Sequence, residues 1–180
     1  IGLRYQTLDA FRLNMSEISK QDMAEYKKHP VYGYDALKNE KWLSTTSLNI
    51  ILLHHETLDG EGFPVHSKQI SQECRIAMVC DTFDEMISGI GCKRVKLYEV
   101  VEYLKNYKNV KFDGKAVDAF LSFVAVYPTG TTVITNEGEK GIVVRQNKDF
   151  QERPVIRITH NNKGEEVTGI VIKDLVKVHN

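Results

Sequence analysis

The sequence predicts a mainly helical body followed by a small all-β appendage, because the spacing of its apolar residues changes once along the chain. Over residues 16–126, apolar residues recur every three to four positions, which is the period of an amphipathic helix. After Tyr127 the period falls to two, and the β-branched residues typical of strands dominate. We therefore expect two domains, a helical one over residues 1–126 and a β appendage over residues 127–180.

The region over residues 1–126 contains several sequence signals for the starts of helices. Ser19 has a side chain that can cap a helix N-terminus, and Pro30 fits the first turn of the helix that follows. The apolar spacing of STTSLNIILLHHE runs on through His55, which we expect to face inward. On the helix RIAMVCDTFDEMIS, Asp81 lies on a narrower polar face. The stripe expected to be buried on that helix consists of Ile76, Val79, Cys80, Phe83 and Ile87. The expected helices span residues 19–29, 30–39, 44–56, 75–88, 96–106 and 116–126.

The β region predicts a meander of three or four strands. Segments rich in valine, isoleucine and threonine span residues 131–135, 141–146, 154–159 and 168–175. The turn sequence NEGEKG separates the first expected strand from the second, and HNNKGEE separates the third from the fourth. A meander of this size needs to curl into a barrel or pack on the helices to be stable, so we expect one of these two arrangements.

Bulk composition excludes several classes of protein. The 180 residues carry 24 Lys and Arg against 24 Asp and Glu, so no global positive field favours a nucleic acid polymer. The longest aliphatic run, residues 50–53, is far shorter than the roughly 20 residues of a membrane span, and no signal pattern begins the sequence. Cys74, Cys80 and Cys92 are odd in number and lack CxxC spacing, which predicts reduced, mostly buried thiols. We expect a cytoplasmic protein.

The segment HHETLDGEGFP, residues 54–64, concentrates residues that bind metals. Histidine nitrogens and carboxylate oxygens together suit Fe, Mn or Zn. On a helix His54 and His55 would lie about 100° apart, so we expect them to reach two ions rather than to chelate one. Two ions held close together can assist phosphoester hydrolysis. The alternative is that one histidine is a core residue and the other faces solvent.

HHETLDGEGFP resembles HHExxDGxGYP, the signature of the HD-GYP family of metal-dependent phosphodiesterases, with Phe63 replacing the tyrosine. Three further segments are similar to family patterns in the same order. They are KHPVYGYDAL (28–37) to KHPxxGxxxL, RIAMVCDTFDEMIS (75–88) to RIxxVaDxfDAmts, and FDGKAVDAF (112–120) to FDPxxVxxF. The resemblance covers most of residues 1–126 and implies an HD-type helical bundle. The β tail is similar to an extension of some bacterial members.

The resemblance also implies roles for individual residues. His29, His54, His55 and Asp81 match metal-binding positions, for two or three divalent transition metal ions, with Fe or Mn expected. No catalytic residue is implied beyond these ligands. Glu56 and Asp59 match positions that support a histidine or the loop backbone. The residues expected to contact substrate or a partner are Gly60, Gly62, Phe63, Pro64 and Lys93.

Two stretches depart from the family pattern. The name-giving His-Asp pair of HDIGK is absent, but Ile1 and Gly2 match the last part of HDIG, so we expect the pair just upstream. Leu3 then stands where the family has a lysine. Where a DRPYR-like run commonly follows, this chain reads GIGCK, and only Lys93 keeps a positive charge. Without the pair, we expect this chain alone to bind metal weakly and to hydrolyse cyclic di-GMP poorly.

Three readings of function follow from the resemblance. The leading one is a phosphodiesterase that hydrolyses a cyclic dinucleotide, cyclic di-GMP, to pGpG or GMP in bacterial second-messenger signalling. The second is a degenerate member that binds a nucleotide or a GGDEF-domain protein, which the departures at Leu3, Ile90 and Cys92 favour. The third is an HD hydrolase of another nucleotide. GGDEF-domain proteins are the expected partners, and a homodimer is left open.

Overall fold

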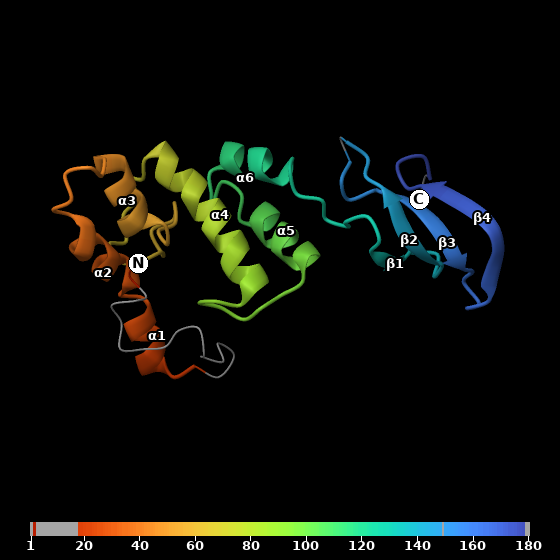
Figure 1. Ribbon diagram of the computed structural model, residues 1–180, viewed down its shortest axis with the longest axis horizontal. Helices are drawn as coiled ribbons and strands as arrows, with labels where there is room; N and C mark the ends of the chain where they lie inside the picture. The colour runs from red at the N-terminus through yellow and green to blue at the C-terminus, as the bar shows by residue number, and fades with distance from the viewer. Residues whose placement is uncertain (1, 3–17, 149, 179–180) are drawn as a thin grey trace. The chain divides into compact units, whose positions relative to one another are not determined.

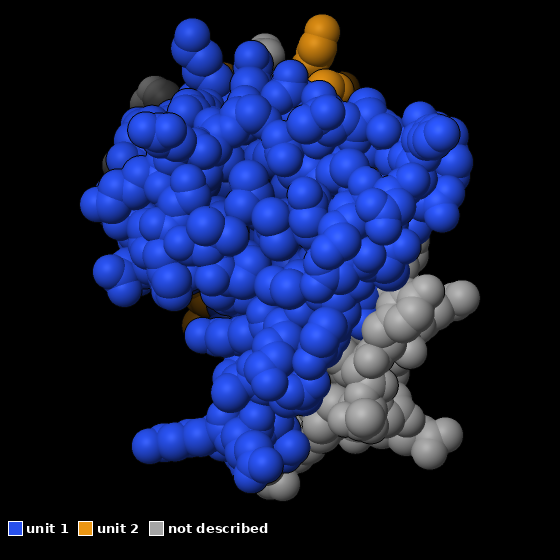
Figure 2. Space-filling model, turned by 90° about the vertical axis from the view of Figure 1, so that its left-hand side faces the viewer, with its two compact units in different colours: residues 1–121 blue, residues 122–180 orange. Residues whose placement is uncertain are grey.

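The computed structural model describes Gly2, residues 18–148 and residues 150–178. The chain divides into two compact units, residues 1–121 and residues 122–180, coloured blue and orange in Figure 2. The first unit is helical and the second is a small β-sheet, so the expected mainly helical fold with a β appendage is confirmed. That two domains fold independently, with a boundary after residue 126, stays a prediction.

Unit 1 is built from helices whose starts follow the sequence signals. Ser19 caps the first helix by accepting a hydrogen bond from the Asp22 backbone N–H at 3.0 Å, and Pro30 lies in the first turn of the second. The helices are α1 (Lys20–Tyr26), α2 (His29–Leu37), α3 (Thr45–Leu53), α4 (Gln72–Ser88), α5 (Leu97–Asn106) and α6 (Gly114–Leu121) (Figure 1). Helix α6 ends at Leu121 rather than at residue 126, and Phe123 beyond it is 88% exposed.

The core of unit 1 has two parts, and α4 contributes to both. Val79 packs with residues of α5 and α6, while Cys74 and Met78 pack with residues of α3. The expected inward stripe was therefore wrong at two positions, since Ile76 is 48% exposed and Cys80 is exposed as well. Helices α5 and α6 pack on one side of α4 and α3 packs on another, and these contacts determine which α4 residues are buried. Apolar spacing along a single helix does not show where its neighbours lie.

Unit 2 is a four-stranded antiparallel sheet in the order β1-β2-β3-β4. Its strands are β1 (Thr132–Ile134), β2 (Lys140–Arg145), β3 (Val155–His160) and β4 (Glu166–Asp174), so the four expected strands are confirmed (Figure 1). Val143, Ile156 and Ile158 form the buried centre of this unit. Tyr127 and Leu175, which flank the sheet in sequence, pack against that centre and extend its small core.

Among the described residues, no helix has both the length and the apolar character that crossing a membrane requires.

Asp113 connects the start of α6 to α4. Its Oδ1 accepts hydrogen bonds from the backbone N–H groups of Lys115, at 2.9 Å, and Ala116, at 3.2 Å. Its Oδ2 lies 3.3 Å from Nη1 of Arg75 on α4. The backbone hydrogen bond from Ala116 is the main reason why the pKa of Asp113 is held below its usual value of 3.8. Asp113 thus has the role of an N-cap residue.

We expect Asp113→Ala to lower the free energy of unfolding of the chain by about 1 kcal/mol, and Asp113→Asn by less, because asparagine can still accept the helix N–H groups. A folded-state pKa below the unfolded value means that this stabilisation is present above about pH 4 and is lost as the pH falls further. Urea denaturation at several pH values measures both effects. Asp35→Ala, which removes an exposed carboxylate paired with Lys38, is the control. Equal stability of Asp113→Ala and wild type at neutral pH would contradict the capping role.

Candidate metal centre

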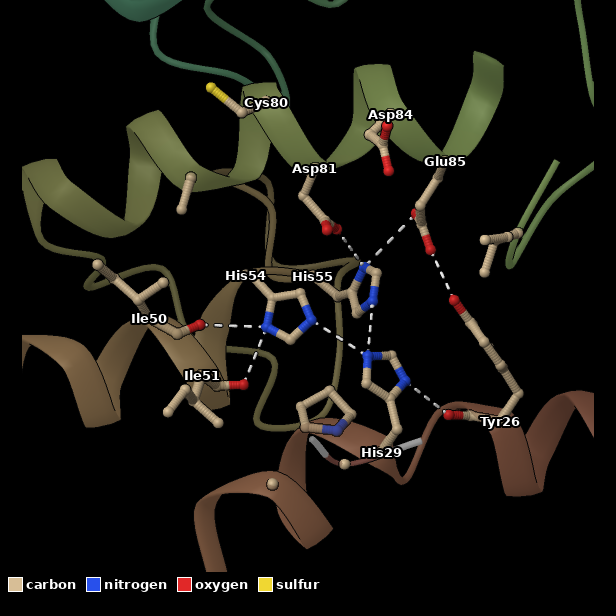
Figure 3. Close-up of a pocket in the computed structure, with 15 residues that line it drawn as sticks. Tyr26, His29, Ile50, Ile51, His54, His55, Cys80, Asp81, Asp84 and Glu85 are labelled. Carbon is tan, nitrogen blue, oxygen red and sulfur yellow. Dashed lines mark hydrogen bonds and ion pairs between the residues drawn. The ribbon is translucent and has the colours of Figure 1, made fainter. Parts of the chain in front are cut away.

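Three histidine rings from two separate segments meet on one side of α4. His29 is the first residue of α2, and His54 and His55 follow α3 directly (Figure 3). Nε2 of His29 lies 3.1 Å from Nε2 of His54 and 3.1 Å from Nε2 of His55. The three nitrogens are close enough to one another to hold a single ion.

The structure removes the helical basis of the expectation that His54 and His55 reach two ions, and the expectation itself stays a prediction. The expectation assumed a helix through both residues, but α3 ends at Leu53 and His55 lies in the turn that follows. Because His55 lies outside the helix, its ring can lie beside the ring of His54, and the two ring centroids are 4.3 Å apart. The sequence contains no strong stop signal at Leu53, which is why the helix end was missed.

Backbone carbonyls fix the positions of the protons on two of the rings. Nδ1 of His29 donates to the Tyr26 carbonyl oxygen at 2.9 Å. Nδ1 of His54 lies 2.9 Å from the carbonyl oxygen of Ile51 and 3.1 Å from that of Ile50 (Figure 3). A carbonyl oxygen can only accept, so Nδ1 of each ring carries the proton and Nε2 presents a lone pair.

Burial keeps the rings of His29 and His55 neutral near physiological pH. It lowers the pKa of His29 to about 4 and that of His55 to about 2, because the charged imidazolium would lose its hydration. Two bare Nε2 atoms 3.1 Å apart, as in His29 and His54, cannot hydrogen-bond to each other. A divalent cation between them would satisfy both lone pairs, so the histidines fit a metal ion of the kind that prefers nitrogen ligands.

Helix α4 adds two carboxylates beside His55. Asp81 Oδ2 lies 3.3 Å and Glu85 Oε2 lies 3.7 Å from His55 Nδ1 (Figure 3). Because His55 is neutral, these contacts are not ion pairs, and Asp81 Oδ2 is buried without a hydrogen-bond partner among the described residues. Burial raises the pKa of Asp81 and raises that of Glu85 to about 7. Asp81 therefore lies beside His55, and its role as a metal ligand stays a prediction.

Glu85 was not among the residues singled out from the sequence. It stands at the position of the alanine in the pattern RIxxVaDxfDAmts, and it follows Asp81 by four residues. That spacing places both carboxylates on one face of α4, so helical periodicity was the signal that could have found it. Glu85 also accepts a hydrogen bond of 2.7 Å from the hydroxyl of Tyr26 on α1.

Glu56 and Asp59 contact the loop rather than the histidines. Glu56 is 1% exposed, and its carboxylate accepts backbone hydrogen bonds from Val65 at 2.6 Å, His66 at 3.0 Å and Ser67 at 3.0 Å. Asp59 accepts hydrogen bonds from the Thr57 hydroxyl and from the Glu61 backbone N–H. Both carboxylates hold the shape of the loop that follows His55.

Gly60 and Gly62 are required in the loop for two different steric reasons. Gly60 has φ of 84°, which side chains other than glycine rarely adopt. At Gly62 an added Cβ would lie 2.4 Å from Cα of Glu56, so only glycine fits this close approach. Phe63 stacks on His55, with ring centroids 4.5 Å apart and an angle of 24°, and precedes Pro64 through a cis peptide bond. Phe63 therefore covers a histidine directly rather than lying beyond the histidines.

A cavity of about 640 Å³ opens onto this cluster. Gly2 and Ile90 line it along with the histidines and the polar face of α4. Lys93 is exposed and is not among the described residues that line the cavity, so the structure does not bring it to the metal centre. Ile1 and Leu3, which carry the expectations about the upstream pair and the missing lysine, lie outside the described residues.

Comparisons with known proteins find a family and several relatives. A family model for the HD domain matches residues 10–116, more than half of the chain. A cyclic di-GMP phosphodiesterase of Pseudomonas aeruginosa is 31% identical over 136 residues, which cover 73% of this chain and 32% of the relative. The cyclic di-GMP phosphodiesterase response regulator RpfG of Xanthomonas campestris is 31% identical over 118 residues, 63% of this chain and 31% of the relative. A cyclic di-GMP phosphodiesterase of Thermotoga maritima is 26% identical over 117 residues, 63% and 32% of the two chains. The chain spans about a third of the length of these relatives.

We expect Glu56→Ala to lower the free energy of unfolding by about 3 kcal/mol, because it leaves backbone N–H groups of the loop without their acceptor. Glu56→Gln keeps one acceptor oxygen and should cost less. The control is Glu61→Ala, an exposed carboxylate of the same loop, with an expected change within about 0.5 kcal/mol. Chemical denaturation measures stability, and limited proteolysis of residues 59–68 measures the order of the loop. Unchanged loop cleavage in Glu56→Ala would contradict the anchoring role.

Proposed function

Because the chain belongs to the HD domain family, we propose that it carries the metal-binding part of a phosphodiesterase that hydrolyses a cyclic dinucleotide. The HHETLDGEGFP motif and the relatives named as cyclic di-GMP phosphodiesterases agree with the HD-GYP branch of that family. Cyclic di-GMP is the proposed substrate, pGpG or GMP the proposed product, and bacterial second-messenger signalling the proposed setting. The relatives are about three times as long as the matched region, so the activity proposed is that of a whole protein of this kind.

The convergence of the histidine lone pairs is the observation that carries this proposal. With the ring protons of His29 and His54 on Nδ1, their Nε2 lone pairs face each other at 3.1 Å, which is costly in a protein interior unless a cation or a proton lies between them. Burial lowers the pKa of His29 and so disfavours an added proton on that ring, and a metal ion is the group that we propose between these nitrogens.

His29, His54, His55 and Asp81 would hold the ions, two or three in number. Nitrogen and oxygen ligands in this mixture suit Fe or Mn. When bound, such ions supply Lewis-acid activation of the phosphoryl group and of the water that attacks it. The carbonyl oxygens of Tyr26 and Ile51 orient the rings before any ion arrives, so little reorganisation is needed on binding.

The cavity and the loop supply the binding surface for the substrate. A volume of about 640 Å³ can take the phosphodiester and one nucleoside of a cyclic dinucleotide beside the histidines. Lys27 Nζ lies 5.3 Å from the centre of the Phe63 ring, which brings a positive charge to the rim of the site. The loop from Gly60 to Pro64 is proposed to contact substrate or a GGDEF-domain protein, and two chains to pair as a homodimer.

A second candidate function is that of a degenerate domain that does not hydrolyse a cyclic dinucleotide but signals by binding a nucleotide or a GGDEF-domain protein. The specific observation that favours it is Ile90, which lines the cavity in the stretch where the family pattern has an arginine and a tyrosine. An apolar side chain there provides no charge for a phosphate group. Lys93, exposed outside the cavity, does not replace that charge in this structure.

We expect His54→Ala and His55→Ala, each made in a protein that also contains the upstream segment, to lower metal content and to reduce turnover of cyclic di-GMP by more than about 100-fold. Each variant removes a nitrogen that faces the other histidines. Phe63→Tyr should leave both quantities largely unchanged, because the aromatic ring that stacks on His55 is kept.

The measurements are elemental analysis of the purified variants and chromatography of the nucleotide products. His160→Ala removes a histidine of unit 2 and is the control for nonspecific metal binding. If His54→Ala and His55→Ala keep the metal content and rate of the wild type, the histidines are ordinary core or surface residues. Normal metal content with no cleavage in the wild type would favour the second candidate function.

A further inference from the structure

Two carboxylates of α4 converge on one nitrogen atom in a partly buried pocket. Asp81 Oδ2 and Glu85 Oε2 both approach His55 Nδ1, and the three atoms lie within 4.8 Å of one another. The side chains of Asp81 and Glu85 are 34% and 19% exposed. Like charges this close repel strongly when water is scarce, so the pair needs a neutralising group.

The described part of the chain offers these carboxylates no lysine or arginine within ion-pair distance. The basic group that both carboxylates approach, His55, is buried, and burial keeps its ring neutral. Asp81 Oδ2 is fully buried and makes no hydrogen bond to any described residue. A buried acceptor atom without a donor indicates a ligand that the protein chain itself does not contain.

Tyr26 contacts one of the two carboxylate oxygens of Glu85 and leaves the other facing His55. Its hydroxyl donates to Oε1 at 2.7 Å, which leaves Oε2 directed at His55 Nδ1. Tyr26 is only 3% exposed, so its ring is held by the surrounding core. The same residue accepts the Nδ1 proton of His29 through its backbone carbonyl. One residue therefore orients a histidine and a carboxylate of the same centre.

Gly91 packs against the hydrogen-bonded side chains of Tyr26 and Glu85. An added Cβ at Gly91 would lie 2.2 Å from the Tyr26 hydroxyl oxygen and 2.3 Å from Glu85 Oε1. The backbone of the GIGCK stretch therefore packs directly against the hydrogen bond between Tyr26 and Glu85. This close packing leaves little free space around Glu85 Oε1 and the Tyr26 hydroxyl.

We propose that Glu85 is a further carboxylate ligand of the metal centre and that Tyr26 is its positioning residue. The neutral ring of His55 has one lone pair, so a cation held by Asp81 and Glu85 either takes Nδ1 of His55, with the ring proton on Nε2, or is held by the two carboxylates beside the histidine-bound ion. Two carboxylate oxygens, with or without that nitrogen, suit Mn²⁺, Fe²⁺ or Zn²⁺. A cation at this position neutralises both carboxylates and provides the partner that Asp81 Oδ2 lacks. The inference rests on the proposed function, because it assigns a role within the same centre.

The test is Mn²⁺ binding by the 180-residue chain, followed by the loss of the free-ion signal in electron paramagnetic resonance. Glu85→Gln keeps the size of the side chain and an acceptor for Tyr26, but removes the charge. We expect it to weaken Mn²⁺ binding by about tenfold or more. Glu102→Gln, an exposed carboxylate on α5, is the matched control and should bind Mn²⁺ as the wild type does.

Tyr26→Phe tests the positioning role separately. It keeps the buried ring and the backbone carbonyl that accepts from His29, but removes the hydroxyl that orients Glu85. We expect weaker Mn²⁺ binding at unchanged stoichiometry. The visible absorption of bound Co²⁺ should also shift, because the spectrum reports ligand geometry, which a loss of stability alone would not alter.

The outcomes separate this inference from the proposed function. If Glu85→Gln matches the wild type in Mn²⁺ affinity and Co²⁺ spectrum, or if the wild-type chain binds no Mn²⁺, the role of Glu85 is overturned. If Glu85→Gln weakens metal binding while a protein with the upstream segment leaves cyclic di-GMP intact, the role of Glu85 stands and the proposed substrate is wrong.

Discussion

The hydrogen bonds from histidine Nδ1 atoms to backbone carbonyl oxygens are the interactions on which the metal centre depends. They connect His29 to Tyr26 and His54 to the last turn of α3. Each bond keeps the ring proton on Nδ1 and turns the Nε2 lone pair toward the same point (Figure 3). Because carbonyls at the ends of α1 and α3 make these bonds, the ends of the helices, rather than their middles, determine the geometry of the site.

The supporting structure follows from that requirement. Helix α3 ends at Leu53, which frees His55 to approach His29, and the loop after His55 is then held by the buried Glu56. Helix α4 turns one side toward the core through Val79 and presents Asp81 and Glu85 to the histidines from another side. Hydrophobic packing thus sets the distance between α4 and the histidine segments, and the polar groups use the position that packing provides.

Much of this could be predicted from the sequence, and the failures have physical causes. Periodicity located the helices and strands, and the motif pointed to the histidines and to Asp81, which the structure brings together. The end of α3 was missed because its last turn continues the apolar spacing without a breaker. Glu85 was missed because a motif directs attention to matching positions, while its contact with Tyr26 joins residues 59 positions apart. Long-range contacts of this kind depend on tertiary packing, which local patterns do not encode.

Crystals of the chain grown with Mn²⁺ and measured at the manganese absorption edge provide the most direct test of this account. Anomalous difference density should appear at a point bounded by the Nε2 atoms of His29, His54 and His55, with the Nδ1 hydrogen bonds of His29 and His54 unchanged. A second peak beside Asp81 and Glu85 would locate the carboxylate ligands as well. Histidine rings that bond to one another or to water, with no anomalous density between them, would contradict the central claim that these lone pairs converge to bind metal.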